Sequence, residues 1–599
     1  MAHSTNAPSE LNDSNSRACI HRHHETVHGR FECQAAQSPD VIALTGEEGQ
    51  LTYSQLERRA NQLAHFLLKK GVRPEDRVGV LLKRSTAAVV SFLAILKAGA
   101  AYVPLDRRYP QERLDFMVDD AGLSFTITED TLVYGAEEIS ELPAHPPLTT
   151  SPIDGVAYVI YTSGSTGTPK GVEIRHTGIL HMVIEANCLR VSDISTFLHV
   201  SSISFDAAVL EIWSPLLHGG QLVIAPDGPL STRRLTELLQ SDITHSLLPT
   251  ALFHRQAEES PESFSRLHTL AVGGEVLSAS HAAKIRAAYP ELRLMNLYGP
   301  TEATVYSTFH VVGDITSCES VPIGRPIPNA RILVLDDRFQ PVEEGSLGEL
   351  FVGGPGLARG YLNRPDLTSE RFIRDPSDTE EIVYRTGDLV RRNESGDLIF
   401  CGRTDNQVKI YGYRIELGEV EAFLQRHESV KQALAAKCED EFGVSFLAVY
   451  YTTHEAVPVT SSELAAYLRL HLPRHMIPRT FIHLAKIPVT VGGKVDRGAL
   501  PEAAAGSMNR LQSMTLEHQV REIWKSVLSL DHLDLDDNLF DAGGASLHAF
   551  RIHQETMRIF EDVEIGLMDV FSYPSVREYS AHLKEKLCET KGTGPTQSE

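Results

Sequence analysis

The feature that most constrains this chain is a polar, glycine-rich stretch that directly follows an apolar one. Residues 156–161 (VAYVIY) are mostly β-branched or aromatic, which predicts a buried strand. Residues 161–171 (YTSGSTGTPKG) then bring hydroxyl side chains and glycines ahead of Lys170. Glycines let backbone N–H groups approach phosphate oxygens, hydroxyls donate hydrogen bonds and the lysine adds positive charge. The pattern favours phosphate binding, although Pro169 and Gly171 distinguish it from the Walker sequence; an ordinary flexible polar loop is the alternative.

The composition fits a globular protein of several domains. The chain has 599 residues, of which 42% are hydrophobic, and this length suggests roughly three to five domains or subdomains. A net charge of −23 argues against nucleic acid or an anionic membrane surface as the main partner. The seven cysteines form no CxxC pair, which argues against a disulfide framework or a zinc site. With no signal-peptide pattern and no apolar run near the ~20 residues that span a bilayer, we expect a soluble, cytoplasmic protein.

Helix and strand patterns alternate from Thr26 to about residue 300. The expected elements include a helix over 56–70, a strand over 78–82, a helix over 86–98 and a strand over 100–105. This alternation is typical of an α/β domain with largely parallel sheets. Residues 1–25 are rich in Ser, Asn and His, and we expect them to be disordered.

Further motifs follow in a definite order along the chain. They are LKAGAAYVPLD at 96–106, FD at 205–206, NLYGPTE at 296–302, GELFVGGPGLARGYL at 348–362, YRTGDL at 384–389, GRTDNQVKIYGYRIELGEVE at 402–421, LPRHMIP at 472–478 and GKVDR at 493–497. Together with the 161–171 stretch they make the chain resemble the adenylate-forming superfamily. Within it the resemblance is to the nonribosomal peptide synthetases: an adenylation domain followed by a peptidyl carrier (thiolation) domain.

The resemblance implies an α/β fold and a division of the chain. We expect a large N-terminal adenylate-forming domain, a small α+β C-terminal subdomain, and an all-α four-helix carrier domain. The boundaries are a disordered segment 1–25, the large subdomain 26–404, the small subdomain 405–500, a linker 501–513, the carrier domain 514–588 and a disordered tail 589–599. Asp405 lies at the hinge about which the resemblance implies that the small subdomain rotates between two half-reactions.

The resemblance and elementary chemistry assign the same residues to ATP and Mg²⁺. The phosphate cradle is Thr162, Ser163, Gly164, Ser165, Thr166, Gly167 and Lys170. Other expected ATP contacts are Gly274, Asn296, Tyr298 at adenine, Thr301 at the α-phosphate, and Asp388 with Arg403 at the ribose hydroxyls. Glu302 offers Mg²⁺ a carboxylate oxygen, the hard ligand that this ion prefers. A surface carboxylate is the alternative for Glu302 or Asp388 alone, and the surrounding motifs argue against it.

Two lysines are the expected catalytic residues. Lys494 follows Gly492-Gly493, a pliable turn from which its ammonium can reach the substrate carboxylate and the α-phosphate and offset charge in the transition state. Many relatives have asparagine at position 492, and an exposed loop lysine is the alternative. Lys409 belongs to the 409–418 loop, which the resemblance brings to the same site in the second half-reaction; Tyr411 in this loop replaces a common basic residue.

The amino-acid pocket is expected to be apolar around one carboxylate. The resemblance makes Asp206 the partner of an α-ammonium group, which favours an α-amino acid over aryl or fatty acids. The remaining lining positions are Ala207, Leu210, Leu247, Ala271, Gly273, Leu297, Val305 and Tyr306. No second charge is present to meet an ionic side chain, and an unpaired buried charge is costly, so we expect a neutral, hydrophobic substrate. Plain core is the alternative, above all for Leu247 and Ala271.

The C-terminal part carries a second motif. An amphipathic helix begins near Leu516, and residues 536–547 (DDNLFDAGGASL) follow it. The motif resembles that of carrier domains, with Ser546 as the attachment site of 4′-phosphopantetheine. Ala545 stands where His or Asp is usual, which bears on recognition by the phosphopantetheinyl transferase. A helix N-cap is the other interpretation of Ser546, and both can hold.

These observations predict an enzyme that uses ATP to form an aminoacyl-AMP and then an aminoacyl thioester on its own carrier. One alternative is a ligase that transfers an acyl or aryl group to free coenzyme A, which Asp206 and the carrier motif oppose. Another is a catalytically inactive loading or scaffold protein, which the intact motifs oppose. No thioesterase or reductase motif follows the carrier, and condensation machinery is absent too. We therefore expect a separate downstream enzyme to accept the aminoacyl thioester, with a truncated gene product as the alternative, and we expect neither nucleic acid nor a membrane as partner.

Overall fold

The computed structural model describes most of the chain. The described residues are 26–149, 152, 154–164, 167–228, 230–313, 320–405, 407–410, 412–439, 445–454, 459–488, 499–501, 516–528, 530, 533–544, 546–560 and 565–591. Three of the expected site residues, Ser165, Thr166 and Lys494, lie outside this part, as do Tyr411, Ala545 and the segment 1–25.

The N-terminal part contains a large mixed sheet with the strand order β14-β13-β12-β11-β10-β8-β9-β1-β2. Its strands are β1 (Ile42–Gly46), β2 (Gly49–Thr52), β8 (Thr196–His199), β9 (Gln221–Ile224), β10 (His245–Pro249), β11 (Thr269–Gly273), β12 (Arg293–Tyr298), β13 (Thr308–Val311) and β14 (Arg325–Pro326). Neighbours from β12 to β1 pair in parallel, and the pairs at both edges are antiparallel.

A second mixed sheet has the order β17-β7-β6-β4-β3-β5. Its strands are β3 (Arg77–Leu81), β4 (Ala101–Pro104), β5 (Phe125–Thr128), β6 (Val156–Thr162), β7 (Lys170–Arg175) and β17 (Gly360–Tyr361). The predicted buried strand is therefore β6, and the polar stretch connects β6 to β7. This connection places Lys170 at the start of a strand.

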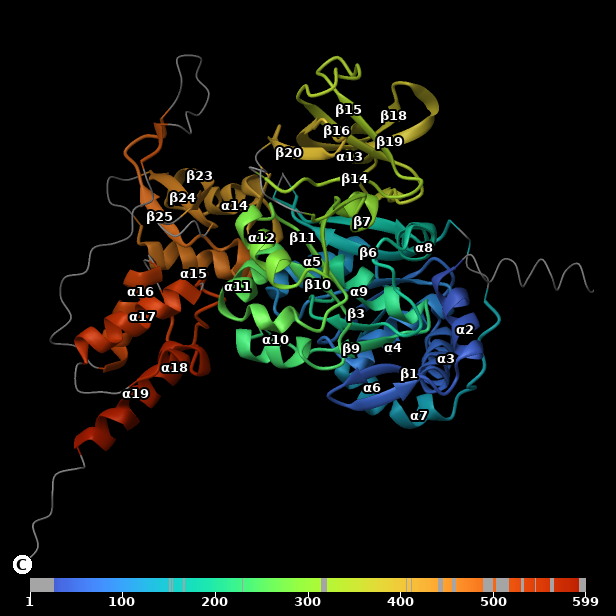
Figure 1. Ribbon diagram of the computed structural model, residues 1–599, viewed down its shortest axis with the longest axis horizontal. Helices are drawn as coiled ribbons and strands as arrows, with labels where there is room; N and C mark the ends of the chain where they lie inside the picture. The colour runs from blue at the N-terminus through green and yellow to red at the C-terminus, as the bar shows by residue number, and fades with distance from the viewer. Residues whose placement is uncertain are drawn as a thin grey trace, which may run out of the picture.

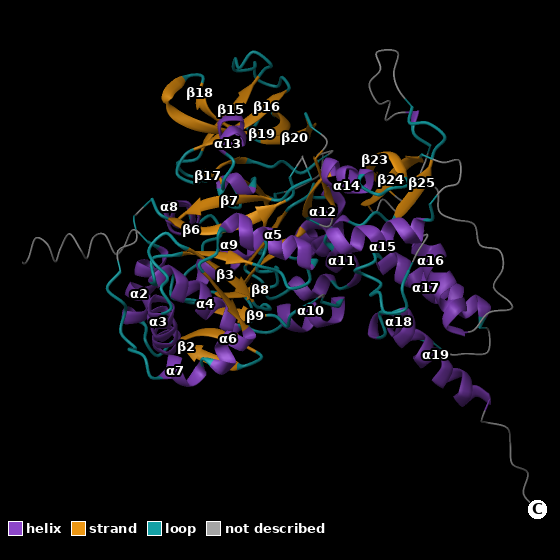
Figure 2. Cartoon of the chain, turned by 180° about the vertical axis from the view of Figure 1, so that it is seen from behind, coloured by secondary structure: helices purple, strands orange, loops and turns teal. Residues whose placement is uncertain are grey.

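Helices lie between and around these sheets (Figures 1 and 2). They are α2 (Val27–Gln37), α3 (Tyr53–Lys69), α4 (Thr86–Lys97), α5 (Gln111–Ala121), α6 (Glu129–Tyr134), α7 (Ala136–Ser140), α8 (His176–Leu180), η1 (His181–Ala186), α9 (Ala207–Leu216), α10 (Thr232–Leu239), α11 (Thr250–Glu259), η2 (Pro261–Phe264), α12 (Ala279–Ala288) and η3 (Thr301–Ala303). α4 contacts β1 of one sheet and β3 and β4 of the other. It is apolar on nearly all sides because both faces are covered.

A third, antiparallel sheet stands apart at the top of Figure 1. It consists of β15 (Arg331–Leu335), β16 (Gly348–Gly353), β18 (Phe372–Asp375), β19 (Asp378–Arg392) and β20 (Leu398–Arg403), with α13 (Pro365–Arg371) before β18. β19 carries Asp388, and β20 pairs with it so that Asp388 lies opposite Arg403. We call everything from α2 to β20 the large subdomain.

The chain then forms a small α+β unit, here called the small subdomain. Its elements are β21 (Gln407–Ile410), β22 (Tyr413–Glu416), α14 (Leu417–Gln425), β23 (Val430–Glu439), β24 (Ser445–Thr453), α15 (Ser461–His471), η4 (Arg474–Met476) and β25 (Thr480–His483). Helices α16 (Leu516–Leu528), α17 (Ser546–Ile559), α18 (Leu567–Ser572) and α19 (Val576–Lys591) follow as a helical module with its own apolar core. In Figure 1 this module lies beside α15.

The structure confirms the fold class and the elements that the sequence predicts. The expected helices over 56–70 and 86–98 are α3 and α4, and the expected strands are β3 and β4. α3 begins earlier than expected because Thr52 and Gln55 form a reciprocal cap at its N-terminus. Among the described residues, no helix is both long enough and apolar enough to cross a membrane.

Candidate active site

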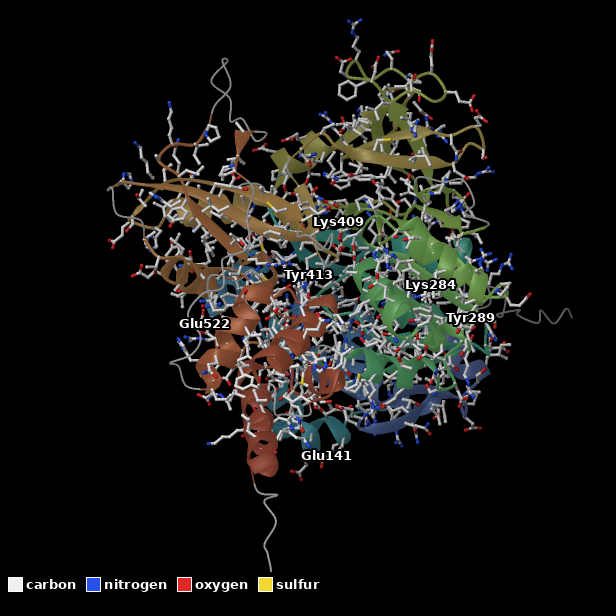
Figure 3. The ribbon with its side chains drawn as sticks, turned by 60° about the vertical axis from the view of Figure 1, so that its left-hand side comes forward. Glu141, Lys284, Tyr289, Lys409, Tyr413 and Glu522 are labelled. Carbon is white, nitrogen blue, oxygen red and sulfur yellow. The ribbon has the colours of Figure 1, made fainter. Side chains whose placement is uncertain are left out.

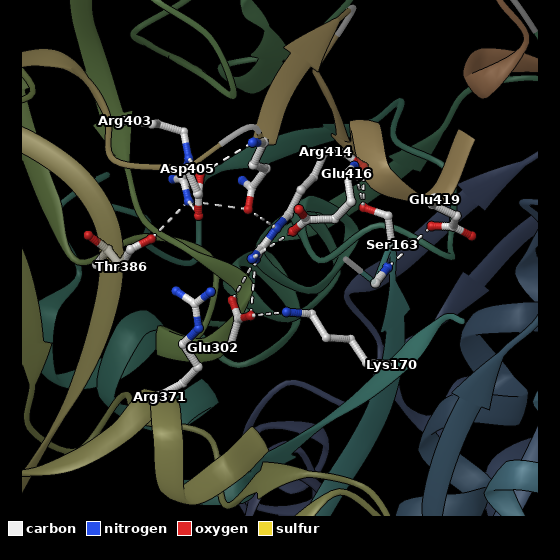
Figure 4. Close-up of polar contacts among 12 residues, drawn as sticks. Ser163, Lys170, Glu302, Arg371, Thr386, Arg403, Asp405, Arg414, Glu416 and Glu419 are labelled. Carbon is white, nitrogen blue, oxygen red and sulfur yellow. Dashed lines mark hydrogen bonds and ion pairs between the residues drawn. The ribbon is translucent and has the colours of Figure 1, made fainter. Parts of the chain in front are cut away.

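The centre of the candidate site is the buried carboxylate of Glu302, which three elements surround (Figure 4). Arg414 of β22 donates to both of its oxygens at 3.1 and 2.8 Å, and the Tyr361 hydroxyl donates to Oε1 at 2.6 Å. Lys170 Nζ lies 3.5 Å from Oε1. Burial alone would raise the pKa of Glu302, but Arg414 and Lys170 outweigh it and hold that pKa well below its usual range.

Lys170 is buried in the same cluster. Its ammonium donates to the Tyr361 hydroxyl at 3.3 Å and lies over the ring of that tyrosine. Burial, and after it the nearby Arg414 guanidinium, lowers the pKa of Lys170 to about 8. The lysine expected at phosphate and the carboxylate expected at Mg²⁺ are thus neighbours in space, although 132 positions separate residues 170 and 302 (302 − 170).

The polar loop before Lys170 contacts the small subdomain. The Ser163 hydroxyl donates to the Arg414 carbonyl at 2.8 Å and accepts from the Glu416 N–H at 3.3 Å. The Gly164 N–H donates to Glu419 Oε2 at 3.2 Å. On its other oxygen, Glu419 accepts from Arg113 of α5 at 2.8 Å.

A second carboxylate, Asp388, lies on β19 of the third sheet, opposite Arg403 of β20. Its two oxygens accept hydrogen bonds from the Tyr298 hydroxyl and from Arg403. Arg403 also donates to Asp405 at 2.7 and 2.9 Å. The residues expected at adenine, at the ribose and at the hinge therefore form one connected polar network. Asn296, also expected at ATP, donates instead to the Pro322 carbonyl at 2.8 Å.

Asp206 is half-buried and lies just before α9. It accepts a hydrogen bond from the Thr301 hydroxyl at 2.6 Å, so this hydroxyl, expected at the α-phosphate, here holds the pocket carboxylate. Burial raises the pKa of Asp206, while Thr301 and the charge of Lys409 lower it in part. A cation is the chemical complement of such a carboxylate.

The 409–418 loop reaches this region from the small subdomain. Lys409 is half-buried, and desolvation lowers the pKa of its ammonium while Asp388 and Asp206 oppose that shift. Tyr413 stacks on His475 at 3.9 Å between ring centroids and meets Phe205 edge-on at 4.8 Å. Figure 3 shows Lys409 and Tyr413 toward the middle of the molecule, where the subdomains meet.

The other pocket positions come together on neighbouring strands and α9. The register places Leu247 beside Ala271 and Gly273 beside Leu297. The buried members among the expected lining are Leu210, Leu247, Ala271, Leu297 and Tyr306. The Tyr306 hydroxyl donates to the Met182 carbonyl at 3.5 Å and also bonds the Cys188 thiol, so the one polar side chain of this lining is already paired within the protein.

The helical module touches both subdomains through the segment before α17. Arg469 lies 3.4 Å from Asp534 and 3.8 Å from Asp537, and Arg474 lies 3.9 Å from Asp541. These three aspartates belong to the segment 534–541.

Arg255 of α11 in the large subdomain reaches the same segment, because its guanidinium lies over the Phe540 ring at 5.2 Å. Ser546 is the first residue of α17, as the motif predicts.

Sequence reasoning assigned no role to Arg414, Glu419, Tyr361 or Arg113. Arg414 and Glu419 lie within the motif at 402–421, and Tyr361 lies within the motif at 348–362. The motifs therefore indicated the segments that carry these three residues, but not the residues themselves. Nothing in the local pattern around Arg113 indicates a contact with Glu419, 306 positions away.

Comparison with protein families divides the chain into two parts. Residues 31–362 match the AMP-binding enzyme family, and residues 518–583 match the phosphopantetheine attachment site family. The first match covers the elements that carry Lys170, Asp206 and Glu302, and the second includes Ser546.

Similar proteins match this chain over most of its length. Tyrocidine synthase 3 of Brevibacillus parabrevis is 37% identical over 94% of this chain and 9% of its own length. Gramicidin S synthase 2 of Brevibacillus brevis is 36% identical over 96% of this chain and 13% of its own length. The chain thus spans only a small part of the length of either relative. A solved structure of holo-PA1221, an NRPS protein with adenylation and PCP domains bound to a vinylsulfonamide inhibitor, is 30% identical with a TM-score of 0.77 over 94% of this chain and 97% of that one.

Proposed function

Because the chain belongs to the nonribosomal peptide synthetase family, we propose that it activates a neutral hydrophobic amino acid and loads it onto its own carrier domain. In the first step the substrate carboxylate attacks the α-phosphorus of ATP, which forms aminoacyl-AMP and releases pyrophosphate. In the second, the phosphopantetheine thiolate attacks the acyl carbonyl and AMP leaves. The helical module α16–α19 is the carrier domain of this proposal.

The observation that carries the proposal is the cluster of Glu302, Lys170 and the 161–171 loop. A buried carboxylate that needs positive charge beside it fits a divalent cation by its donor chemistry, and Mg²⁺ bound there would neutralise phosphate charge. Lys170, with the N–H groups and hydroxyls of the loop, would bind the β- and γ-phosphates. Asp388, Tyr298 and Arg403 would bind the nucleoside. Lys494, outside the described residues, stays the predicted catalytic lysine of the first step.

Asp206 and the apolar lining support an uncharged amino acid as the substrate. The α-ammonium group would pair with Asp206, whose half-buried carboxylate has a neutral hydroxyl, Thr301, as its hydrogen-bond partner. The Tyr306 hydroxyl is paired with Met182 and Cys188 and offers little to a polar substrate side chain. A charged side chain would remain unpaired here at considerable cost. Hydrophobic pockets discriminate single methylenes by only ~1–3 kcal/mol, so several apolar amino acids are expected as substrates.

Loading in cis is supported by the contacts of the carrier domain. The segment 534–541 approaches arginines of both subdomains, and this segment directly precedes the helix that begins at Ser546. A phosphopantetheinyl transferase would supply the arm on Ser546, and a separate enzyme would accept the aminoacyl thioester. The arm would allow a thiol to reach an adenylate that the carrier backbone does not touch.

The test is amino-acid-dependent exchange of labelled pyrophosphate into ATP, measured across the common amino acids, aryl acids and fatty acids. Strong exchange with one or a few hydrophobic amino acids supports the proposal and names the substrate. Exchange only with aryl or fatty acids would overturn the assignment of Asp206 and favour an acyl ligase. Absence of exchange from folded protein would favour a binding-only role. A Lys494→Ala variant that retains full activity would refute the catalytic assignment of that lysine.

A further inference from the structure

The carboxylate of Glu419 accepts hydrogen bonds at the polar loop, as a bound anion would. One of its carboxylate oxygens accepts the Gly164 N–H at 3.2 Å, and the other accepts from Arg113 at 2.8 Å. Its side chain is fully buried, and that of Arg113 is 7% exposed. A backbone N–H of a glycine-rich loop together with a guanidinium is the set of donors that protein sites use for phosphate oxygens. In this structure a carboxylate of the small subdomain satisfies these donors.

Arg414 occupies the position of a cation at Glu302. It donates to both carboxylate oxygens of Glu302, and the same residue accepts the Ser163 hydroxyl on its carbonyl. Arg414 and Glu419 are carried by adjacent elements, β22 and α14. One small-subdomain segment therefore presents a positive group to the proposed metal ligand and a negative group to the proposed phosphate loop.

Helix α14 lies against the polar loop. A Cβ atom at Gly167, which has a φ of +82°, would lie 3.0 Å from the Cβ of Ala422 on α14, so the helix lies directly against the loop. A phosphate group near Gly164 would also face the negative charge of Glu419. Sterics and charge thus both oppose simultaneous occupation by α14 and by a polyphosphate.

We propose that Arg414 and Glu419 together are a built-in substitute for magnesium pyrophosphate, which holds the small subdomain on the large one. This inference rests on the proposed function, because it takes the 161–171 loop as the phosphate site. Arg414 and Glu419 are positioning residues: they fix the orientation in which the 409–418 loop and the carrier domain face the adenylate. Pyrophosphate must leave before the small subdomain docks, and pyrophosphate that returns displaces it.

The proposal predicts opposite effects on two measurements. Docking by α14 reduces the fraction of molecules open to pyrophosphate, so the apparent dissociation constant of wild-type protein exceeds the intrinsic one. Glu419→Gln weakens docking, so magnesium pyrophosphate is expected to bind about three- to tenfold more tightly, as measured by calorimetric titration of the full-length chain. In the same variant, thioester formation on the carrier from preformed aminoacyl-AMP is expected to slow by a similar factor.

Arg113→Gln provides an independent route to the same result. The substitution removes the guanidinium of the large subdomain that donates to Glu419, and it leaves the small subdomain unaltered. It therefore tests the contact even if Glu419→Gln fails to fold. Thioester formation is expected to slow as it does in Glu419→Gln, and the gain in pyrophosphate affinity is expected to be smaller, because Arg113 is also one of the donors suited to phosphate. Since the two residues act through one contact, the double variant should bind pyrophosphate no more tightly than about the better single variant.

Glu421→Gln is the matched control. It makes the same chemical change on the same helix, but Glu421 accepts from the Ala435 N–H inside the small subdomain. Its pyrophosphate affinity is expected to equal that of wild type within about twofold. A role of Glu419 in stability alone would make pyrophosphate binding weaker or leave it unchanged.

Three results would count against the inference in distinguishable ways. Equal pyrophosphate affinity of wild type and Glu419→Gln would overturn the inference and leave the phosphate site intact. Tighter binding in Glu421→Gln as well would show that the effect is not specific to the loop contact. Binding by none of these folded proteins would overturn the phosphate assignment itself, and the inference with it.

Discussion

At the candidate site the small subdomain meets the large subdomain through buried charges, whereas its charged contacts with the carrier domain are exposed. Glu302 and Glu419 have fully buried side chains, and their arginine partners Arg414 and Arg113 are only 16% and 7% exposed. At the carrier, Asp534 and Arg474 are 57% and 68% exposed, and the charged atoms lie 3.4 to 3.9 Å apart. The first contact is desolvated and closely fitted to its partners, and the second is hydrated and loose.

The difference in burial indicates different roles for the two contacts. A buried ion pair is strongly destabilised when one partner is removed, because the other charge stays buried and unpaired. An exposed pair contributes about 0–1 kcal/mol and is screened by salt. The contact between the subdomains therefore suits a docked state with one defined geometry. The contact with the carrier domain suits transient binding, in which the carrier brings its thiol to the site and then dissociates.

Glu302→Gln is the largest test of the buried side of this comparison. The variant leaves Arg414 and Lys170 without their shared carboxylate and removes the proposed metal ligand. Because Glu302 would bind the Mg²⁺ that neutralises phosphate charge, we expect amino-acid-dependent pyrophosphate exchange to fall by at least about a hundredfold. Exchange is measured at saturating ATP over a range of Mg²⁺ concentrations.

Glu349→Gln is the control for this change. Glu349 pairs with Arg385 at 2.8 Å on the third sheet, where the arginine is 39% exposed. Exchange by this variant is expected to stay within about threefold of wild type, since pairs with an exposed partner contribute little. A comparable loss in both variants would show that the Glu302 effect reflects general instability rather than the site.

The sequence predicted the parts of this site that local pattern encodes. The strand β6, the loop after it and Lys170 follow from apolar and glycine-rich runs, and the motif order indicated Glu302 and Asp388. What the sequence did not indicate is how residues meet across the subdomain junction. Arg414 and Glu302 are 112 positions apart, and their contact depends on how two separately folded units pack, which no local periodicity records.

The sequence also does not indicate which partner a hydrogen-bonding side chain contacts when it has more than one suitable partner. Thr301, which is expected at the α-phosphate, donates to Asp206 in this structure, and the Asp388 carboxylate accepts from Tyr298 and Arg403. Each residue type was assigned to a chemistry that it can perform. In this structure the donors and acceptors satisfy one another, because buried polar groups without partners are costly. A motif indicates which residues belong to the site. It does not indicate which hydrogen bonds and ion pairs they form in each orientation of the small subdomain.

Lys170 offers a second, smaller test, through pH. Its pKa of about 8 lies below the usual value, so the charged ammonium is present below pH 8 and is lost as the pH rises through that value. Pyrophosphate affinity is therefore expected to fall above pH 8, by up to about tenfold per pH unit. The unfolded chain binds more protons at this lysine between its folded and ordinary pKa values, so the contribution of this group to stability rises with pH there.

Lys170→Arg is the matched variant, because arginine keeps its charge throughout this range. Calorimetric titration with magnesium pyrophosphate from pH 7 to about 9 compares the two proteins, and the titration of pyrophosphate itself cancels in their ratio. The ratio of wild-type to variant affinity is expected to fall across pH 8. A ratio that stays constant would mean that Lys170 keeps its proton at the open site, and that burial together with Arg414 lowers its pKa only in the docked one.

The smallest expected effect lies at the carrier contact. Arg474→Asp places two like charges where Arg474 and Asp541 now lie 3.9 Å apart, and at low salt it should slow thioester formation by about two- to fivefold, in keeping with the worth of an exposed pair. The rate is measured relative to pyrophosphate exchange by the same preparation, so that folding and adenylation cancel.

Exchanging the charges tests the contact itself. The double variant Arg474→Asp/Asp541→Arg should recover most of the rate, and the differences among wild type and the two variants should vanish at high salt. A loss of a hundredfold that salt does not relieve would contradict the comparison, because it would make the carrier contact as demanding as the buried junction. A few-fold, salt-sensitive loss would support the comparison. It would mean that the exposed carrier contact is weak and that the buried ion pairs between the subdomains contribute most of the docking energy.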